Sequence, residues 1–174
     1  VAFVLIPAWV YAPRADLKAT LEHGAPTTAP LPTPFLTHWL HRMDDDRVSN
    51  FILHAGFNST DGERLKIVFV PCYLDGRDGI FDTPYYDLLI GMDATLYPSY
   101  YEPWGYTPLE SVAFGIPTVT TDLAGFGRWA QTVVSGRDIT EGVAVVHRTD
   151  DNYAAVVDES ADALLTLMRR SDAE

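Results

Sequence analysis

Apolar runs alternate with segments of helical periodicity along this chain, and together they predict a series of strands and helices. Short, nearly continuous apolar runs are typical of strands buried in a sheet, and they predict strands at Val1–Ile6, Leu65–Val70, Ala94–Tyr97, Thr118–Thr121 and Val143–His147. Apolar residues on one helical face predict helices at Ala15–His23, Phe35–Met43, Tyr85–Met92, Thr107–Phe114, Phe126–Ser135 and Ala154–Arg170. The alternation of strand and helix predicts an α/β fold with a parallel sheet and right-handed crossovers.

Three of these segments carry a more specific expectation about burial. Val1–Ile6 is apolar at every position, so we expect it to be covered on both faces of the sheet. One face of the helix predicted at Phe35–Met43 carries Leu36, Trp39, Leu40 and Met43. The buried side of the helix predicted at Ala154–Arg170 carries Leu164, Leu165, Leu167 and Met168.

Proline and charged residues mark the segments between these elements. Ala25–Pro34 contains four of the twelve prolines, which favours a loop or an extended segment over a helix. The acidic run Asp44–Asp46 is interpreted as the solvated end of an element, in preference to a metal site. For His38 and His41, three positions apart on a predicted helix, we expect packing or surface roles and no bound metal.

Composition and charge narrow the class of protein. At roughly 150 residues per domain, the 174 residues correspond to one domain. The chain has 12 basic and 24 acidic residues, and its net charge of −12 argues against nucleic acid or an anionic membrane as a main partner. No apolar run approaches the roughly 18 residues that cross a bilayer. Cys72 is the only cysteine, which excludes an internal disulfide and is most simply explained by a cytoplasmic location.

The segment Ser99–Glu110 (SYYEPWGYTPLE) carries the clearest chemical pattern, because it connects a predicted strand to a predicted helix. In parallel α/β folds, ligands bind at this edge of the sheet, against helix N-termini. Gly105 allows close approach of a ligand, and the N–H groups of Gly105, Tyr106 and Thr107 are able to face an anion. Glu102 and Glu110 are placed to bracket one ligand. The alternative is that Thr107 and Glu110 form only a capping box and that Glu102 is an exposed loop acid.

A second glycine-containing segment, Gly115–Gly127 (GIPTVTTDLAGFG), has the same strand-to-helix position. The predicted strand leaves the core at Asp122, and Gly125 and Gly127 flank Phe126 before the next helix. Two glycines at this spacing indicate either a weak phosphate-binding signal or a plain turn, and the pattern leaves both open.

The run from Tyr97 to Gly127, YPSYYEPWGYTPLESVAFGIPTVTTDLAGFG, resembles the glycogen synthases of the animal and fungal type. The segments VAFVLIPA, PFLTHWLH, HAGFNSTDGERLKIVFVPCYL and TPYYDLL also stand in family-like order. This resemblance implies a retaining glycosyltransferase of the two-domain GT-B architecture, with a Rossmann-like C-terminal domain that binds the sugar nucleotide. It further implies UDP-glucose as the donor substrate, an α-glucan as the acceptor, and neither a cofactor nor a metal.

The resemblance also implies roles for individual residues. Glu102 matches the carboxylate that stabilises positive charge at the anomeric carbon, and Glu110 matches the acid that bonds the nucleotide ribose. The backbone N–H groups at Trp104 and Gly105 would contact glucose hydroxyls, and those at Tyr106 and Thr107 the diphosphate. By the same comparison, Tyr85 would stack on uracil and Tyr73 would line the base pocket. Spacing alone leaves both tyrosines open as ordinary core or rim aromatics.

The family's basic Gly-Arg…Lys-Gly motif and its N-terminal acceptor domain have no counterpart in residues 1–174. We therefore expect the chain to be a partial C-terminal donor-binding domain, without its first strand–helix unit and without transferase activity by itself. The family's arginine-rich regulatory helix has no counterpart either, so regulation by a phosphosugar is not expected.

The sequence leaves two alternatives open. One is a different GT-B glycosyltransferase that uses another sugar nucleotide, such as an ADP-sugar. The other is a non-catalytic nucleotide-sugar-binding domain, against which the presence of both Glu102 and Glu110 argues. The oligomeric state is also open, a homo-oligomer included.

Overall fold

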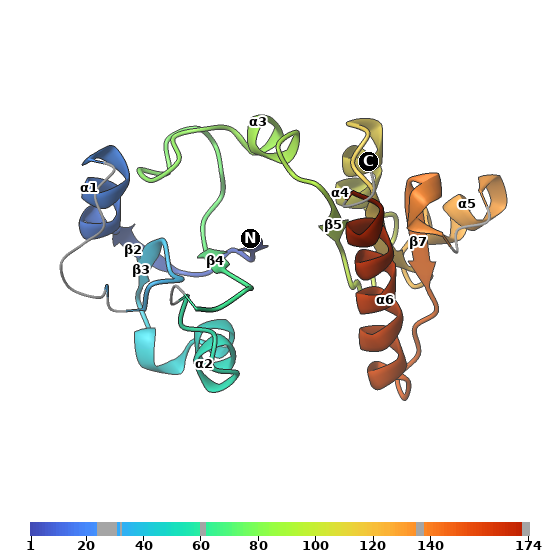
Figure 1. Ribbon diagram of the computed structural model, residues 1–174, viewed down its shortest axis with the longest axis horizontal. Coiled ribbons are helices and arrows are strands. Elements are labelled where there is room, and N and C mark those ends of the chain that lie inside the picture. The colour runs from blue at the N-terminus through green and yellow to red at the C-terminus, as the bar shows by residue number, and fades with distance from the viewer. Residues whose placement is uncertain (24–30, 32, 60–61, 135–137, 172–174) are drawn as a thin grey trace. The chain divides into compact units, whose positions relative to one another are not determined.

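The computed structural model describes residues 1–23, 31, 33–59, 62–134 and 138–171 (Figure 1). The chain forms two compact units, Val1–Asp87 (unit 1) and Leu88–Glu174 (unit 2). Among the described residues, no helix combines the length and the apolar character that crossing a bilayer requires.

Unit 1 contains two small sheets. In the first, β1 (Ala2–Leu5) and β4 (Ile67–Val70) pair in parallel. In the second, β2 (Val10–Pro13) and β3 (His38–Leu40) pair in antiparallel fashion, with an irregular register. The helical elements are α1 (Ala15–His23), the 3₁₀ turn η1 (Met43–Asp45), α2 (Arg47–His54) and α3 (Tyr85–Leu89), which contains the boundary between the units.

The helix predicted at Phe35–Met43 is wrong, because β3 lies within this segment and Met43 already belongs to the 3₁₀ turn η1. The Phe69 N–H donates to the Phe35 carbonyl at 2.6 Å, and the Thr37 N–H donates back to the Phe69 carbonyl at 3.1 Å. Phe35, Leu36 and Phe69 are buried together in the core of unit 1. Pairing with strands that are distant in the sequence outweighs the helical pattern, since a helix this short is marginal by itself.

The strand predicted at Val1–Ile6 is confirmed as β1, but its burial on both faces is wrong. Val4 packs against the core of unit 1. Phe3 and Leu5 are exposed at 37% and 38%. Among the described residues β1 pairs with β4 alone, and the core cluster of unit 1 touches only one face of the pair.

Unit 2 is a three-layer α/β unit. Its sheet has the order β5 (Thr95–Leu96), β6 (Thr118–Thr121) and β7 (Val143–Val146), with both pairs parallel. The helical elements are α4 (Tyr106–Ala113), α5 (Gly125–Val133), the 3₁₀ turn η2 (Ile139–Glu141) and α6 (Tyr153–Ser171). The α/β class and its parallel strands flanked by helices are therefore confirmed.

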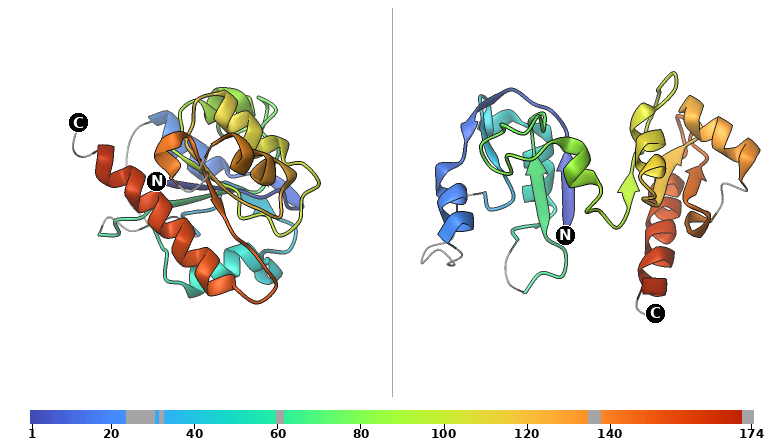
Figure 2. Two further views of the ribbon diagram at one scale, coloured as in Figure 1. Left: turned by 90° about the vertical axis from the view of Figure 1, so that its right-hand side faces the viewer. Right: turned by 90° about the horizontal axis from the view of Figure 1, so that it is seen from above.

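Helices lie on both sides of the sheet of unit 2 (Figure 2), and successive residues of β7 belong to different clusters on its two faces. Ala144 and Val146 belong to the cluster that includes Val156 of α6. Val143 and Val145 belong to the cluster that includes Phe126 of α5. This period of two is the reason why β7 is apolar throughout: each of its faces is covered by a helix.

The long C-terminal helix is confirmed, but half of its predicted buried side is wrong. Leu164 and Leu167 pack on the sheet as expected. Leu165 and Met168 are exposed at 43% and 62%. Positions 156, 163, 164 and 167 share one face at helical spacing, and residues 165 and 168 fall outside that stripe.

The acidic run is the end of an element, as predicted. Asp44 and Asp45 lie in η1, and Asp46 is the N-cap of α2, where its carboxylate accepts the Ser49 N–H at 2.7 Å. Helix α2 itself was not predicted. The proline-rich segment Ala25–Pro34 lies largely outside the described residues.

Candidate functional site at the carboxyl edge of the sheet in unit 2

The carboxyl ends of β5, β6 and β7 meet at one edge of the sheet of unit 2 because the three strands are parallel. The loop that contains Glu102 follows β5, Asp122 follows β6, and His147 follows β7. The segment Ser99–Glu110 thus connects a strand to a helix, as predicted.

Gly105 begins helix α4 in a conformation that favours glycine. It is buried and is the N-cap of the helix, with φ of +98°. A Cβ atom here would lie 3.2 Å from Pro108 Cγ and 3.5 Å from Glu102 Oε2. The Glu102 carboxylate therefore lies close to the start of the helix.

The predicted capping box of Thr107 and Glu110 is wrong, because α4 begins one residue earlier than expected. Thr107 is the second residue of the helix and Glu110 the fifth, so they do not stand at the N-cap and N3 positions. The N–H groups of Tyr106 and Thr107 lie in the first turn, where a helix supplies no acceptor of its own. This helix start is suited to an anion.

Glu102 is half-buried, and its backbone is fixed by the neighbouring helix. It forms a parallel bridge with Ala124, and its carbonyl accepts the Gly125 N–H at 3.3 Å. The Ser99 hydroxyl donates to Glu102 Oε2 at 3.3 Å. Glu102 is therefore not a free loop acid, and its carboxylate has a defined position.

The two glycines around Phe126 serve close packing. The N–H groups of Gly125 and Phe126 donate to the carbonyls of Glu102 and Trp104, so the 102–104 backbone occupies these first donors of α5. A Cβ at Gly125 would lie 2.3 Å from the Pro103 oxygen, and one at Gly127 would lie 2.1 Å from the Thr121 oxygen. The turn interpretation is therefore favoured over phosphate binding at α5.

The side chains around the start of α4 differ in exposure. Tyr106 is 67% exposed. Trp104 is 37% exposed, and its ring lies 6.4 Å from that of Trp129. The roles expected for Trp104, Tyr106 and Thr107 involve their backbone N–H groups. The exposure of the side chains therefore does not test these roles.

Tyr73 and Tyr85 belong to unit 1, where they flank one loop. The Tyr85 N–H donates to the Leu74 carbonyl at 2.9 Å, and Asp75 pairs with Pro84 across the base of the loop. Tyr73 is 80% exposed, and Tyr85 is half-buried. The pairing thus brings the two tyrosines to the same end of the loop.

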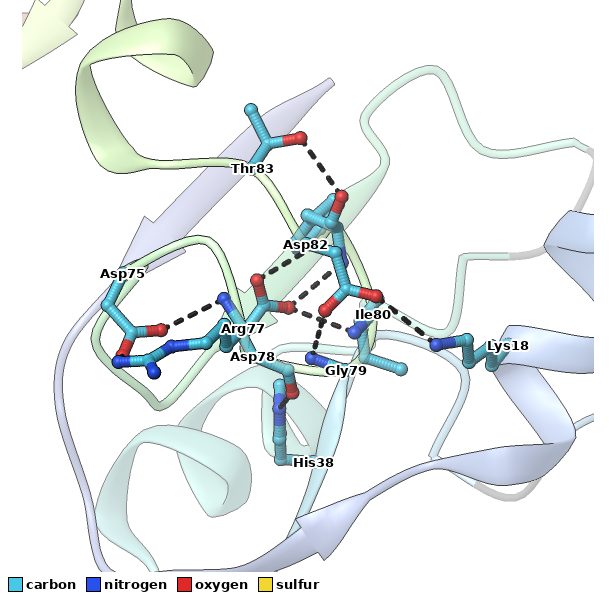
Figure 3. A network of polar contacts seen from close by, with 10 residues as sticks. Lys18, His38, Asp75, Arg77, Asp78, Gly79, Ile80, Asp82 and Thr83 are labelled. Atoms are coloured by element: carbon cyan, nitrogen blue, oxygen red, sulfur yellow. Dashed lines mark hydrogen bonds and ion pairs between the residues drawn. The ribbon is translucent and has the colours of Figure 1, made fainter.

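The loop between these tyrosines is held by its own carboxylates (Figure 3). The Asp78 side chain accepts the N–H groups of Ile80 and Phe81 at 3.0 and 2.9 Å. The Asp82 side chain accepts the Gly79 N–H at 2.7 Å, and the Lys18 ammonium at 3.2 Å. These bonds give the loop a defined conformation without a metal ligand role for either acid.

His38 has a packing position and His41 a surface position, as expected. His38 is buried, and its Nε2–H donates to the Asp78 carbonyl at 2.8 Å. His41 is exposed, with its ring 5.1 Å from that of Trp9.

Burial raises the pKa of Cys72 to about 11, an effect increased by the nearby charges of two aspartates, so this thiol is protonated at neutral pH. Within the described ranges, no three His, Cys, Asp or Glu residues form a group able to hold a metal ion.

A second polar network at the carboxyl edge of unit 2 was missed in the sequence. Asp122 Oδ2 lies 2.6 Å from His147 Nδ1, and Asp122 Oδ1 accepts the Arg148 N–H at 2.9 Å. The hydrogen bond that His147 donates to Asp122, followed by the negative charge of Asp122, raises the pKa of His147. The Arg148 guanidinium also donates to the Pro98 carbonyl at 2.5 Å. The available signal was position, since Asp122 and Arg148 directly follow predicted strands and His147 is the last residue of one.

The chain is similar to glycogen synthases. A family model described as glycogen synthase matches residues 25–173. "Glycogen [starch] synthase" of Caenorhabditis elegans is 35% identical over 131 residues, which are 75% of this chain and 19% of that protein. "Glycogen [starch] synthase isoform 1" of Saccharomyces cerevisiae is 31% identical over 130 residues, 74% of this chain and 18% of that protein. The chain thus spans about a fifth of the length of these relatives.

Proposed function

This chain belongs to the glycogen synthase family, and on that premise we propose that it provides the donor-binding part of a retaining GT-B glucosyltransferase. The donor is UDP-glucose, and the acceptor is the end of an α-1,4-glucan bound elsewhere in the complete protein. The single observation that carries the proposal is the fixed position of the Glu102 carboxylate beside Gly105, at the start of α4.

The proposed chemistry assigns separate tasks to the two acids. Transfer with retention passes through an oxocarbenium-like transition state, whose positive charge a nearby carboxylate stabilises. Glu102 performs this task because its position is defined before the substrate arrives. Glu110, five residues into α4, bonds the ribose and so acts mainly on donor affinity.

The negative charge of the leaving UDP is taken up by the start of α4. The N–H groups of Tyr106 and Thr107 bond the diphosphate there, and the helix dipole favours the same charge. The N–H groups at Trp104 and Gly105 bond glucose hydroxyls. The family resemblance implies that Tyr85 stacks on uracil and that Tyr73 lines the base pocket. It also implies transfer without a cofactor or a bound metal.

The test is transfer of labelled glucose from UDP-glucose to glycogen by the complete protein in which this chain occurs. We expect Glu102→Ala to lower kcat by at least about a hundredfold while UDP affinity is retained. Glu110→Ala provides the matched comparison, with a donor KM raised about tenfold, the value of one hydrogen bond to a charged group. Both variants remove an acid from the same loop–helix segment, so they differ in role more than in location.

Three outcomes would redirect the proposal. A Glu102→Ala protein with wild-type turnover would remove Glu102 from the chemistry. Transfer from ADP-glucose in place of UDP-glucose would indicate another GT-B glycosyltransferase. Binding of UDP without any transfer would indicate a non-catalytic nucleotide-sugar-binding domain.

A further inference from the structure

The main chain of the loop after β5 is fastened to the two neighbouring strands. The Thr121 hydroxyl, at the end of β6, donates to the Ser99 carbonyl at 2.6 Å. Arg148, which follows β7, donates to the Pro98 carbonyl at 2.5 Å. The Ser99 N–H is itself bonded to the Tyr97 carbonyl at 2.8 Å. Consecutive peptide groups on both sides of the Ser99 Cα are therefore held in place.

The Ser99 side chain extends from this fixed backbone to Glu102. Its hydroxyl donates to Oε2 of the Glu102 carboxylate at 3.3 Å. The backbone of Glu102 is fixed separately, by its bridge to Ala124 and by the Gly125 N–H. With both backbones fixed, the hydrogen bond restricts the remaining freedom of the pair, which is rotation about the side-chain bonds of Ser99 and Glu102.

The two oxygens of Glu102 have different surroundings as a result. Oε2 lies on the Gly105 side, 3.5 Å from the point that a Cβ of Gly105 would occupy. Among the residues that the structure describes, none donates a hydrogen bond to Oε1. Ser99 thus holds one carboxylate oxygen beside the start of α4, which leaves the other oxygen able to face a bound sugar.

We infer that Ser99 is a positioning residue for the transfer reaction, which acts through Glu102 and does not touch the donor. The inference rests on the function proposed above, because it assigns Ser99 the task of orienting the charge-stabilising carboxylate. A carboxylate that rotates away from the reacting carbon no longer stabilises its charge, and small misplacements lower rates strongly. Donor affinity is determined by other groups, so the loss appears in kcat.

The experiment compares Ser99→Ala with Ser99→Thr in the complete protein. We expect Ser99→Ala to lower kcat about tenfold, with the donor KM unchanged, because one hydrogen bond to a charged group is lost. Ser99→Thr keeps the hydroxyl and restores at least half of the wild-type kcat. Thr95→Val is the matched control: it removes a half-buried hydroxyl, bonded to Thr118 at 2.8 Å, from the opposite end of β5, and it leaves kcat unchanged.

A double-mutant cycle separates positioning from a general structural role. If Ser99 acts through Glu102, Ser99→Ala has no further effect on kcat in a Glu102→Ala background. Additive losses, an unchanged kcat in Ser99→Ala, or a raised donor KM with normal kcat would each overturn the inference. Each of these results leaves UDP-glucose transfer by the wild-type protein intact, so the proposed function would stand.

A crystal structure of the Ser99→Ala protein tests the geometry without an activity measurement. We expect the Glu102 carboxylate to adopt a second orientation, in which neither of its oxygens lies beside Gly105. A carboxylate that keeps its wild-type orientation would overturn the inference even in a protein that transfers no glucose. A wild-type protein without transfer contradicts the proposed function alone, since the orientation of the carboxylate is judged separately.

Discussion

At the scale of single residues, Arg14 has an unusual environment for a charged side chain. It is fully buried, and its guanidinium donates to the carbonyls of Thr33 and Leu36 at 2.7 and 3.2 Å. It also forms two bonds to the Asp16 carboxylate, at 3.1 and 2.6 Å, and lies 4.5 Å from the Trp39 ring centre. Every part of the planar fork is thus used.

We predict that Arg14→Lys lowers the free energy of unfolding by about 3 kcal/mol, because an ammonium cannot reproduce the forked bonds or the stacking. Arg42→Lys is the control, since Arg42 forms an exposed ion pair with Asp45 and a conservative change there costs less than about 0.5 kcal/mol. Urea denaturation of the chain measures both. Equal effects of the two substitutions would contradict the role assigned to Arg14.

The His147–Asp122 pair predicts a pH dependence of stability. Asp122 raises the pKa of His147 in the folded state, and Glu159 contributes in the same direction. The pair therefore stabilises the fold fully below the unfolded-state pKa of about 6.5. This stabilisation is lost as the pH rises through the folded-state pKa.

The measurement is the melting temperature of the wild type and of His147→Ala from pH 5 to pH 9. We expect the wild type to melt higher than the variant at the acid end and the difference to vanish at the alkaline end. Because His147 is on the surface, added salt should reduce the difference. A difference that grows with pH would show that the pair has the opposite effect.

At the scale of elements, close packing of helix α5 on β6 depends on Gly127. A Cβ at this position would lie 2.1 Å from the Thr121 carbonyl oxygen, a backbone atom that cannot move without displacing the strand. We predict that Gly127→Ala destabilises the protein by about 3 kcal/mol or more through overpacking. Denaturation measured by circular dichroism provides the test.

Gly62→Ala is the matched control for this prediction. No atom of the described residues lies within 4 Å of a Cβ built at Gly62, so the same substitution changes stability by less than about 0.5 kcal/mol. If Gly127→Ala were as neutral as Gly62→Ala, the close approach of α5 to β6 would be contradicted.

At the scale of the whole molecule, we predict weak binding of a nucleotide, because the family's basic motif for the diphosphate has no counterpart in residues 1–174. One stacked tyrosine contributes about 1–3 kcal/mol, and a helix N-terminus about 0.3–2 kcal/mol. With a ribose hydrogen bond of about 1 kcal/mol, UDP should bind this chain with a Kd in the millimolar to high-micromolar range. Calorimetric titration with UDP, and with ADP in parallel, measures this.

The expected result of the titration is weak binding that prefers UDP. Tyr85→Ala should weaken UDP binding further, because the proposed stacking of Tyr85 on uracil is lost. Tyr153→Ala is the control, since Tyr153 is an exposed tyrosine on α6. Binding of ADP that equals or exceeds that of UDP would contradict the donor assignment. Micromolar or tighter binding would contradict the estimate of affinity.

The sequence by itself determined the elements whose pattern is self-contained. β4, β6, β7, α4 and α6 were predicted because their apolar residues follow the period of the element that they form. The sequence also singled out Glu102 and Glu110 as candidate site residues, since their motif lies within one continuous segment. In both cases the signal is carried by neighbours in the chain.

Tertiary structure alone decided the features that depend on residues far apart in the sequence. Residues 35–40 pair with β2 and β4, although the local pattern of Phe35–Met43 favoured a helix. Gly125 and Gly127 serve packing because the 102–104 loop and β6 lie against α5. Such contacts form only when distant segments of the chain meet, so the local periodicity of the sequence does not predict them.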